Sequence, residues 1–187
     1  DDGPDWSLCP AGPIFDFYIR DFGAGIERKG APADFVATQV TITGRSNYLL
    51  EGDVVGTQAD QRLLADKMTY DAESDTAVAD GHVRYQDSEA AFTATHATSQ
   101  LSYQKSKLDN VQYELIRQHG NGVAEHAERY AELDSHLTKV TYSTCPPTKR
   151  DWEFHAATID IGAVSSCRMV GRRHVWLVKN AMRPHRQ

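Results

Sequence analysis

The chain has 187 residues, of which 40% are hydrophobic and 25% are charged, a composition typical of a soluble protein with one domain. Its 26 acidic residues outnumber its 20 Lys and Arg residues and give a net charge of −6. This balance disfavours nucleic acid as a partner, because such binding depends on neutralising phosphates. No run reaches the roughly 20 apolar residues of a membrane-spanning helix. A start at Asp1 without a signal-like segment is typical of a mature or excised form.

Residues 1–35 differ in composition from the rest of the chain. Prolines and glycines punctuate them too densely for long regular elements, so we expect a flexible lead-in. It carries Cys9 in the sequence Trp-Ser-Leu-Cys-Pro. An exposed cysteine on such an arm is typical of a residue that pairs with a cysteine elsewhere.

A repeat organises the central part of the chain. Glu-Gly-Asp-Val begins at Glu51 and a near copy, Asp-Gly-His-Val, begins at Asp80, so the two glycines are 81 − 52 = 29 residues apart. A fixed period of this kind indicates that one supersecondary unit is being stacked. Between the copies, the polar cluster 71–75 is bounded by strand-like runs, as in a hairpin connection. The repeat therefore predicts a series of similar β-hairpins.

Strand-like segments extend on both sides of the repeat. They begin with an alternating run over 36–42 and continue after the repeat with a strand over 100–104, a turn over 105–110 and a strand over 111–115. Residues 123–137 have a helix-forming composition, but their position among so many strands predicts two strands. A last strand is expected over 152–156. Roughly ten short strands, with turns near every tenth residue, predict an all-β antiparallel sandwich or barrel.

Within the predicted strands apolar and polar residues alternate. Val83 and Tyr85 fall on one face, whereas His82, Arg84 and Gln86 fall on the other. One face of the sheet therefore meets water and the other meets apolar matter. That apolar matter can be a second sheet of the same protein, and the alternation alone leaves this alternative open.

The sequence contains no pattern of an enzyme that we can identify. Its eight histidines are scattered, with no His-Glu-x-x-His motif. It has no Gly-x-Ser-x-Gly nucleophile elbow and no phosphate-cradling glycine loop. Neither Cys9 nor Cys145 has a Cys or His at metal-ligand spacing. We therefore predict a protein that is not an enzyme and that has no cofactor and no metal site.

Five stretches carry a family resemblance. They are Gly-Asp-Val (52–54), Leu-Leu-Ala-Asp-Lys-Met-Thr-Tyr-Asp (63–71), Ala-Asp-Gly-His-Val-Arg-Tyr-Gln-Asp (79–87), Thr-Tyr-Ser-Thr-Cys-Pro (141–146) and Asp-Trp (151–152). In this order they resemble the periplasmic OstA/LptA-like domain of the LptD family of lipopolysaccharide assembly proteins. The repeat is shared with LptA and LptC, and the two cysteines narrow the resemblance to the LptD family. The resemblance implies an antiparallel β-jelly roll over 36–161, an open sandwich whose two sheets do not close on each other.

The resemblance also implies a function at the periplasmic face of the outer membrane of a Gram-negative bacterium. The domain would receive lipopolysaccharide from a bridge of similar jelly rolls, joined to an LptA-like protein by edge-strand addition, and pass it to an outer-membrane barrel with its plug lipoprotein LptE. The barrel itself is absent from this sequence. Acyl chains would lie in a groove, and each candidate lining residue can instead be ordinary sandwich core. The candidates are Val54, Leu64, Met68, Tyr70, Val83, Tyr85, Leu101, Tyr103, Val111, Tyr113, Leu115, Val140, Tyr142, Trp152 and Phe154.

In that family the cysteines that match Cys9 and Cys145 each form a disulfide with the barrel. A bridge between Cys9 and Cys145 within this chain is the alternative. The resemblance ends after Asp160, because residues 162–187 contain basic residues and no acidic one. This atypical tail includes Cys167, for which the family provides no counterpart. The alternative function for the whole chain is a stand-alone periplasmic jelly-roll module that binds carbohydrate or a protein partner.

Overall fold

The computed structural model describes residues 13–103, 105–117, 119–130 and 135–161. These residues form an all-β antiparallel fold, which confirms the fold class predicted from the sequence. The strands are β1 (Asp34–Val36), β2 (Gln39–Thr43), β3 (Asn47–Gln58), β4 (Gln61–Asp71), β5 (Thr76–Gln86), β6 (Ala90–Gln100), β7 (Lys105–Leu115), β8 (Gly120–Arg129), β9 (Ser135–Tyr142) and β10 (Phe154–Ile161). A 3₁₀ turn, η1 (Leu101–Tyr103), lies between β6 and β7.

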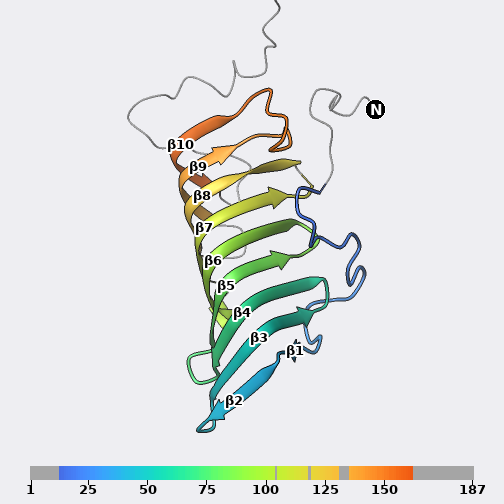
Figure 1. Ribbon diagram of the computed structural model, residues 1–187, viewed down its shortest axis with the longest axis vertical. Helices are drawn as coiled ribbons and strands as arrows, with labels where there is room; N and C mark the ends of the chain where they lie inside the picture. The colour runs from blue at the N-terminus through green and yellow to red at the C-terminus, as the bar shows by residue number, and fades with distance from the viewer. Residues whose placement is uncertain (1–12, 104, 118, 131–134, 162–187) are drawn as a thin grey trace, which may run out of the picture.

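The ten strands form one sheet in which chain neighbours pair (Figure 1). From β3 to β10 every strand is antiparallel to the next, so the sheet is a continuous meander of hairpins. At one edge β1 and β2 both pair with β3, one with each half of it. Local hairpin connections explain this order, because each turn returns the chain directly to its neighbour.

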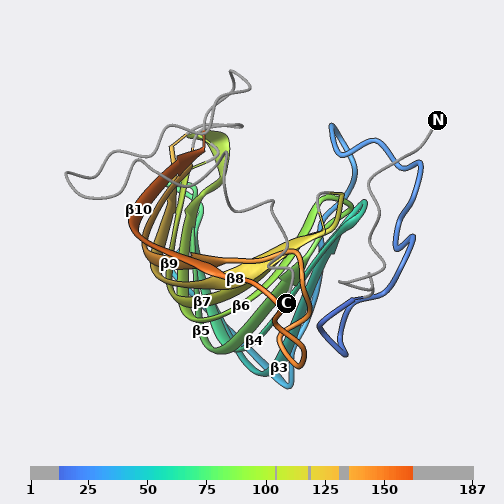
Figure 2. The ribbon, with the colours of Figure 1, turned by 90° about the horizontal axis from the view of Figure 1, so that it is seen from above.

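The repeat in the sequence marks the line along which the sheet bends. The β3 and β5 strands are bulged at the repeat, with left-handed backbone at Gly52 (φ 77°) and Gly81 (φ 73°) and at the residue after each glycine. Asn110 in β7 and Lys139 in β9 also have positive φ. Bulges bend the strands that contain them. Figure 2 shows the result, a sheet folded lengthwise into two arms.

The core lies inside the fold, where the arms meet. In four successive hairpins a valine pairs with an alanine at this line, and these residues form the crease row. They are Val54 with Ala65, Val83 with Ala94, Val111 with Ala124, and Val140 with Ala156. All but Ala156 are buried. Alternating large and small side chains let the two arms approach closely, because a valine on one strand fills the space beside an alanine on the next.

Three predicted elements differ from the structure in detail. The expected strand over 36–42 is divided into β1 and β2, which pair with different halves of β3. The expected strand over 100–104 is the turn η1, and the expected turn over 105–110 lies inside β7. Residues 123–137 do form strands, in β8 and β9, as predicted against their helix-forming composition.

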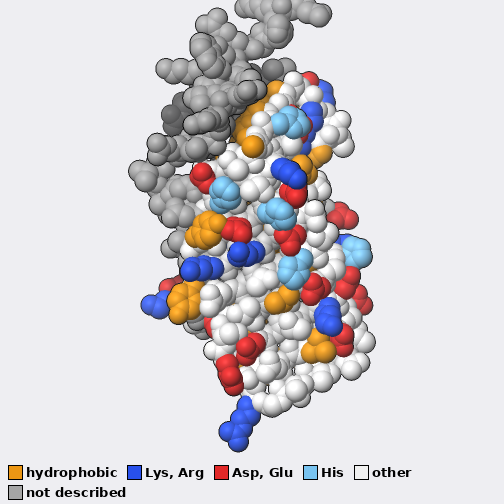
Figure 3. All heavy atoms as spheres, turned by 90° about the vertical axis from the view of Figure 1, so that its left-hand side faces the viewer, with side chains coloured by type: hydrophobic (Ala, Val, Ile, Leu, Met, Phe, Trp, Pro, Cys, Tyr) orange, Lys and Arg blue, Asp and Glu red, His pale blue; other side chains and the backbone are white. Residues whose placement is uncertain are grey.

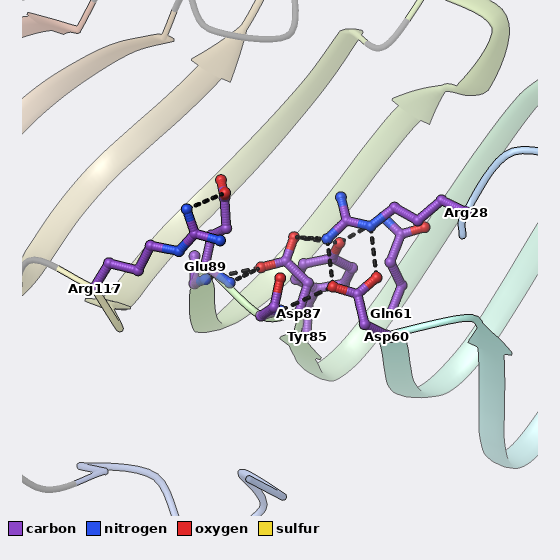
Figure 4. A network of polar contacts seen from close by, with 9 residues as sticks. Arg28, Asp60, Gln61, Tyr85, Asp87, Glu89 and Arg117 are labelled. Carbon is purple, nitrogen blue, oxygen red and sulfur yellow. Dashed lines mark hydrogen bonds and ion pairs between the residues drawn. The ribbon is translucent and has the colours of Figure 1, made fainter. Parts of the chain in front are cut away.

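Residues 13–31, which we call the strap, pack on the outer face of one arm. Gln86 both donates to and accepts from the backbone of Ile19, and Glu114 accepts a hydrogen bond from the backbone of Ile14. Arg28 contacts Asp60 at 2.6 Å and Asp87 at 3.2 Å, across two hairpin turns (Figure 4). In the described residues the lead-in is therefore a packed segment rather than an unattached arm.

Candidate functional site

The concave face of the bent sheet is the surface on which the predicted site residues converge. We call its two sides the aromatic arm, which carries the strap on its outside, and the histidine arm. In the aromatic arm a row of large side chains, three of them aromatic, crosses successive strands, and we call it the ring row. It contains Leu63, Tyr85, Phe92 and Tyr113.

The tyrosine rings of the aromatic arm are held by their hydroxyl groups. Tyr85 accepts a hydrogen bond from Gln61 and donates one to Asp87, and its ring stacks on Phe92 at 4.9 Å. Tyr113 donates to the backbone oxygen of Thr141 at 2.7 Å. Burial raises the pKa of both phenols, so both stay neutral and act as donors. The rings are thus fixed in position before any ligand binds.

A second aromatic cluster lies at the end of the sheet near β10. Tyr142 contacts Phe154 at 5.3 Å and Trp152 at 6.0 Å between ring centroids. Two glycines of β8 provide the room: a Cβ on Gly120 would meet the Tyr142 ring at 2.4 Å, and a Cβ on Gly122 would meet the Thr141 oxygen at 1.9 Å. The glycines are therefore required by close approach.

The concave side of the histidine arm is aliphatic and has small side chains in its centre. We call this row the alanine row. From β3 to β10 its members are Leu50, Met68, Ala79, Ala97, Leu108, Ala127, Leu137 and Ile159. Opposite the fixed rings, the sheet thus presents a surface with little side-chain bulk.

Farther from the crease, the same arm carries a row that changes character along the sheet. It starts with Tyr48 and Tyr70, whose rings stack at 6.1 Å, and then Ala77. From β6 to β9 it is polar, and we call this part the polar strip, composed of Ser99, Ser106, Arg129 and Ser135.

The outer face of the histidine arm repeats one pair of residues. Histidines lie beside acidic residues across neighbouring strands (Figure 3). The Nδ1 to Oδ distances are 2.8 Å for His82 with Asp66, 2.6 Å for His96 with Asp80, 2.7 Å for His126 with Asp109, and 2.5 Å for His136 with Asp160. These pairs make the convex face polar, which is the division of faces that the alternation predicted.

The structure brings most of the predicted lining residues to the concave face. The side chains at the crease are buried, whereas the rings around it are partly exposed and available to a ligand. The crease set is Val54, Val83, Val111 and Val140, joined by Met68 in the alanine row, and the ring set is Tyr70, Tyr85, Tyr113, Tyr142, Trp152 and Phe154. Leu115 lies at the end of β7 on the same face as Tyr113. Contact with lipid at these residues stays a prediction.

Three predicted lining residues lie elsewhere. The bulge between Leu64 and Lys67 shifts the alternation of β4, so Ala65 faces inward and Leu64 lies on the outer face, opposite exposed Arg84. Leu101 and Tyr103 are in the turn η1, where their side chains are 51% and 63% exposed. We therefore leave these residues out of the lining set. Of the alanine row, the sequence analysis predicted only Met68; the alanines of the row carry a weak hydrophobic signal.

Cys145 lies in a fully buried position beside β8 and β9. Its backbone oxygen accepts hydrogen bonds from Asn121 and Arg150, and its backbone nitrogen donates to Ser143. Cys145 is disulfide-bonded to a cysteine outside the described residues, where both Cys9 and Cys167 lie. The predicted bonds from Cys9 and Cys145 to a barrel stay a prediction.

In the part of the chain that the structure describes, no three His, Cys, Asp or Glu residues are placed to hold a metal ion. None of the helical segments described there is long and apolar enough to cross a membrane.

Comparison with known proteins identifies relatives of the chain. No family model matches it. It is 34% identical over 170 residues to the LPS-assembly protein LptD of Xylella fastidiosa (strain Temecula1), covering 86% of this chain and 21% of the relative. It is 32% identical over 160 residues to LptD of Xanthomonas euvesicatoria, covering 83% of this chain and 20% of the relative.

The solved structures that are similar to the chain include that of LptH, the LptA-homologous periplasmic component of the lipopolysaccharide transport device of Pseudomonas aeruginosa. It matches with a TM-score of 0.49 and 15% identity, over 55% of this chain and 78% of that chain. By sequence the chain is thus a relative of the LPS-assembly protein LptD, and it spans about one fifth of the length of the LptD proteins that it matches.

Proposed function

We propose that this chain is a non-catalytic periplasmic domain that carries lipopolysaccharide by holding its acyl chains on the concave face of the sheet. One observation supports this proposal above the others: the crease row and the alanine row make the floor of the concave face apolar from β3 to β10, whereas the convex face of the histidine arm is charged and polar. An amphiphile with several acyl chains fits such a division. Burial of apolar surface stabilises binding by about 25 cal/mol per Å².

The arrangement of strands also fits transport. Each strand from β3 to β10 crosses the fold from one arm to the other, so the rows of concave side chains continue from strand to strand. A ligand that lies along these rows meets similar apolar contacts at each strand. We propose that acyl chains move along the sheet from the β1–β2 edge toward β10 and are passed from there to an outer-membrane barrel with its LptE plug.

The β1–β2 edge is the proposed docking site for an LptA-like bridge protein. It carries four exposed apolar side chains, Phe35 (50%), Val36 (67%), Val40 (54%) and Ile42 (62%). Val40 and Ile42 pair with Leu50 and Tyr48, so they extend the concave face to the edge. An unpaired edge of this kind favours strand addition. A bridge protein that adds a strand there would continue the apolar surface.

In the complete protein, the proposed bonds to the barrel would replace the disulfide that Cys145 forms within this chain and would fix the domain relative to the barrel. Cys145 is anchored by three hydrogen bonds of its own backbone, so a bond from it would hold the β8–β10 end of the sheet in place. In the complete protein we expect Cys145→Ser to change the disulfide pattern on non-reducing gels. An unchanged pattern would remove Cys145 from the proposal.

Photo-crosslinking of the purified chain with lipopolysaccharide tests the function. A photoreactive side chain at Tyr113 should label lipopolysaccharide, whereas the same group at Gln112, the adjacent residue on the opposite face, should not. Deacylated polysaccharide should label neither position. Equal labelling by deacylated polysaccharide would instead support the alternative, a module that binds carbohydrate, and absence of labelling from every concave position would contradict lipid transport.

A further inference from the structure

We propose that the polar strip of the histidine arm, with Arg129 at its centre, binds an anionic phosphate on the head group of the acylated ligand. This inference rests on the proposed function, because it assumes that acyl chains occupy the alanine row beside the strip. It adds an orientation: the head group lies on the rim of the histidine arm rather than on the rim of the aromatic arm.

Arg129 differs from the other members of the rows that line the concave face. Of the described members of the crease row, the alanine row, the polar strip and the ring row of the aromatic arm, it alone carries a charge. It follows Ala127 of the alanine row by two residues in β8, so both side chains lie on the concave face. A cation on a face that is otherwise apolar and hydroxylic implies an anionic partner there.

The carboxylate next to Arg129 in the sequence is engaged elsewhere. Glu128 faces the convex side, where it forms an ion pair with Lys107 at 3.0 Å and accepts a hydrogen bond from Tyr130. Among the described residues, Arg129 itself forms no ion pair with a carboxylate. Its side chain is exposed. The guanidinium is therefore available to a ligand from the concave side.

The residues around Arg129 supply hydroxyl groups in a regular array. Ser106 and Ser135 are its register partners on the two neighbouring strands, and Ser99 is the partner of Ser106. Neighbouring strands are about 4.8 Å apart, so the hydroxyls of Ser106 and Ser135 flank the guanidinium at intervals close to the width of a phosphate or sugar group. Ser99 lies one strand farther away, and its hydroxyl donates to the backbone oxygen of Lys105. An arginine fork binds phosphate through two parallel hydrogen bonds, and serine hydroxyls complete such a site.

The apolar surface lies at the right distance for the same ligand. Arg129 is two positions along the strand from Ala127, a distance of about 6.6 Å. Leu108 and Leu137 flank Ala127 in the alanine row. A phosphorylated sugar with acyl chains can thus place its phosphate on the strip and its chains on the row below. At the opposite rim the described arginines Arg28 and Arg117 each form an ion pair with a carboxylate of the protein, and the tyrosine hydroxyls are already bonded.

Binding of two matched glycolipids to the purified chain tests the inference. The probes are a phosphorylated, acylated disaccharide and the same molecule after removal of its phosphates. We expect Arg129→Ala to weaken binding of the phosphorylated probe about tenfold and to leave the dephosphorylated probe unchanged. Arg129→Lys, which keeps the charge but loses the fork, should show an intermediate loss. Arg84→Ala, an exposed arginine on the convex face, is the matched control and should change neither affinity.

The outcomes separate the two proposals. For each protein, the affinity for the phosphorylated probe is divided by the affinity for the dephosphorylated probe. If this ratio is the same for Arg129→Ala and for the wild type, the proposed phosphate site is wrong. In that case the proposed function still stands provided that Leu108→Asp abolishes binding of both probes. If the wild type binds neither probe, or if Leu108→Asp has no effect, the lipid-binding concave face is itself contradicted. A far-ultraviolet circular dichroism spectrum identical to that of the wild type confirms that each variant is folded.

Discussion

Gly52 and Gly81 occupy the same position in two hairpins, one at the bend of β3 and the other at the bend of β5. Both have left-handed backbone, with φ of 77° and 73°, and a Cβ on either would lie within 3.0 Å of a side chain of the neighbouring segment. The spacing of the sequence repeat is therefore the spacing of the bends. The shape of the concave face depends on these two residues.

Substitution of the bend glycines tests this dependence. Gly52→Ala should lower the free energy of unfolding by about 1–2 kcal/mol, because alanine disfavours positive φ and its Cβ would meet Thr38 at 2.8 Å. Gly44→Ala is the control: Gly44 also has positive φ, but nothing lies within 4 Å of an added Cβ. It should cost only the backbone strain. Urea unfolding of the variants measures the difference, and an equal loss at both sites would show that close approach at the bend is unimportant.

The ion pair of Arg28 and Asp60 should stabilise the strap on the hairpin turns. Asp60 is almost fully buried, accepts from both Arg28 and the Ser88 backbone, and lies beside Asp87 in the network of Figure 4. Arg28→Met leaves its carboxylate without a cation and should cost about 2 kcal/mol. The double variant Arg28→Met/Asp60→Asn should be more stable than Arg28→Met alone. Equal stability of the two variants would contradict the stabilising role of this ion pair.

The same pair predicts a pH dependence. Hydrogen bonds from the Arg28 guanidinium hold the pKa of Asp60 well below its usual range. A carboxyl whose pKa is lower in the folded than in the unfolded state stabilises the protein above its unfolded value of about 4, and this contribution is lost as the pH falls. The wild type should therefore lose more stability than Asp60→Asn between about pH 5 and about pH 2.5, a range that brackets the pKa of an aspartate in the unfolded chain. Parallel pH profiles from thermal unfolding would contradict this assignment.

The histidine pairs of the convex face should contribute little individually. His96 and Asp80 are register partners at 2.6 Å, but their side chains are 40% and 49% exposed. A double-mutant cycle with His96→Gln and Asp80→Asn should give a coupling of about 0.2–1 kcal/mol that decreases with added salt. A coupling above about 2 kcal/mol would mean that the pair is desolvated in solution.

The sequence predicted the features that depend on local pattern. The glycine repeat predicted the series of hairpins, although not that its glycines lie at the bends, and the alternation assigned Val83, Tyr85 and Tyr113 to one face. It failed for Leu64, since a bulge shifts the phase of β4 by one residue and no pattern marks the shift at that position. Simple alternation from Met68 back to Leu64 crosses this bulge.

The features that the sequence did not predict depend on contacts between distant segments. The strap is held by side chains of hairpin ends that bind its backbone, for example Gln86 with Ile19, 67 residues apart. Such bonds leave no periodic signal. Arg129 lies in a stretch of helix-forming composition. The face of the sheet that carries its side chain could therefore be assigned only from the register of β8 with β7. The alanine row can be recognised only when the registers of all neighbouring strand pairs are known.

The central claim, that acyl chains occupy the concave face, is tested most directly by nuclear magnetic resonance of leucine and valine methyl groups with a glycolipid that carries a spin label on one acyl chain. Bound ligand should broaden the methyl signals of Leu108 and Leu137 on the concave face and leave those of Val78 and Val123 on the convex face sharp. Broadening of Val78 and Val123 with Leu108 and Leu137 unaffected would contradict the account.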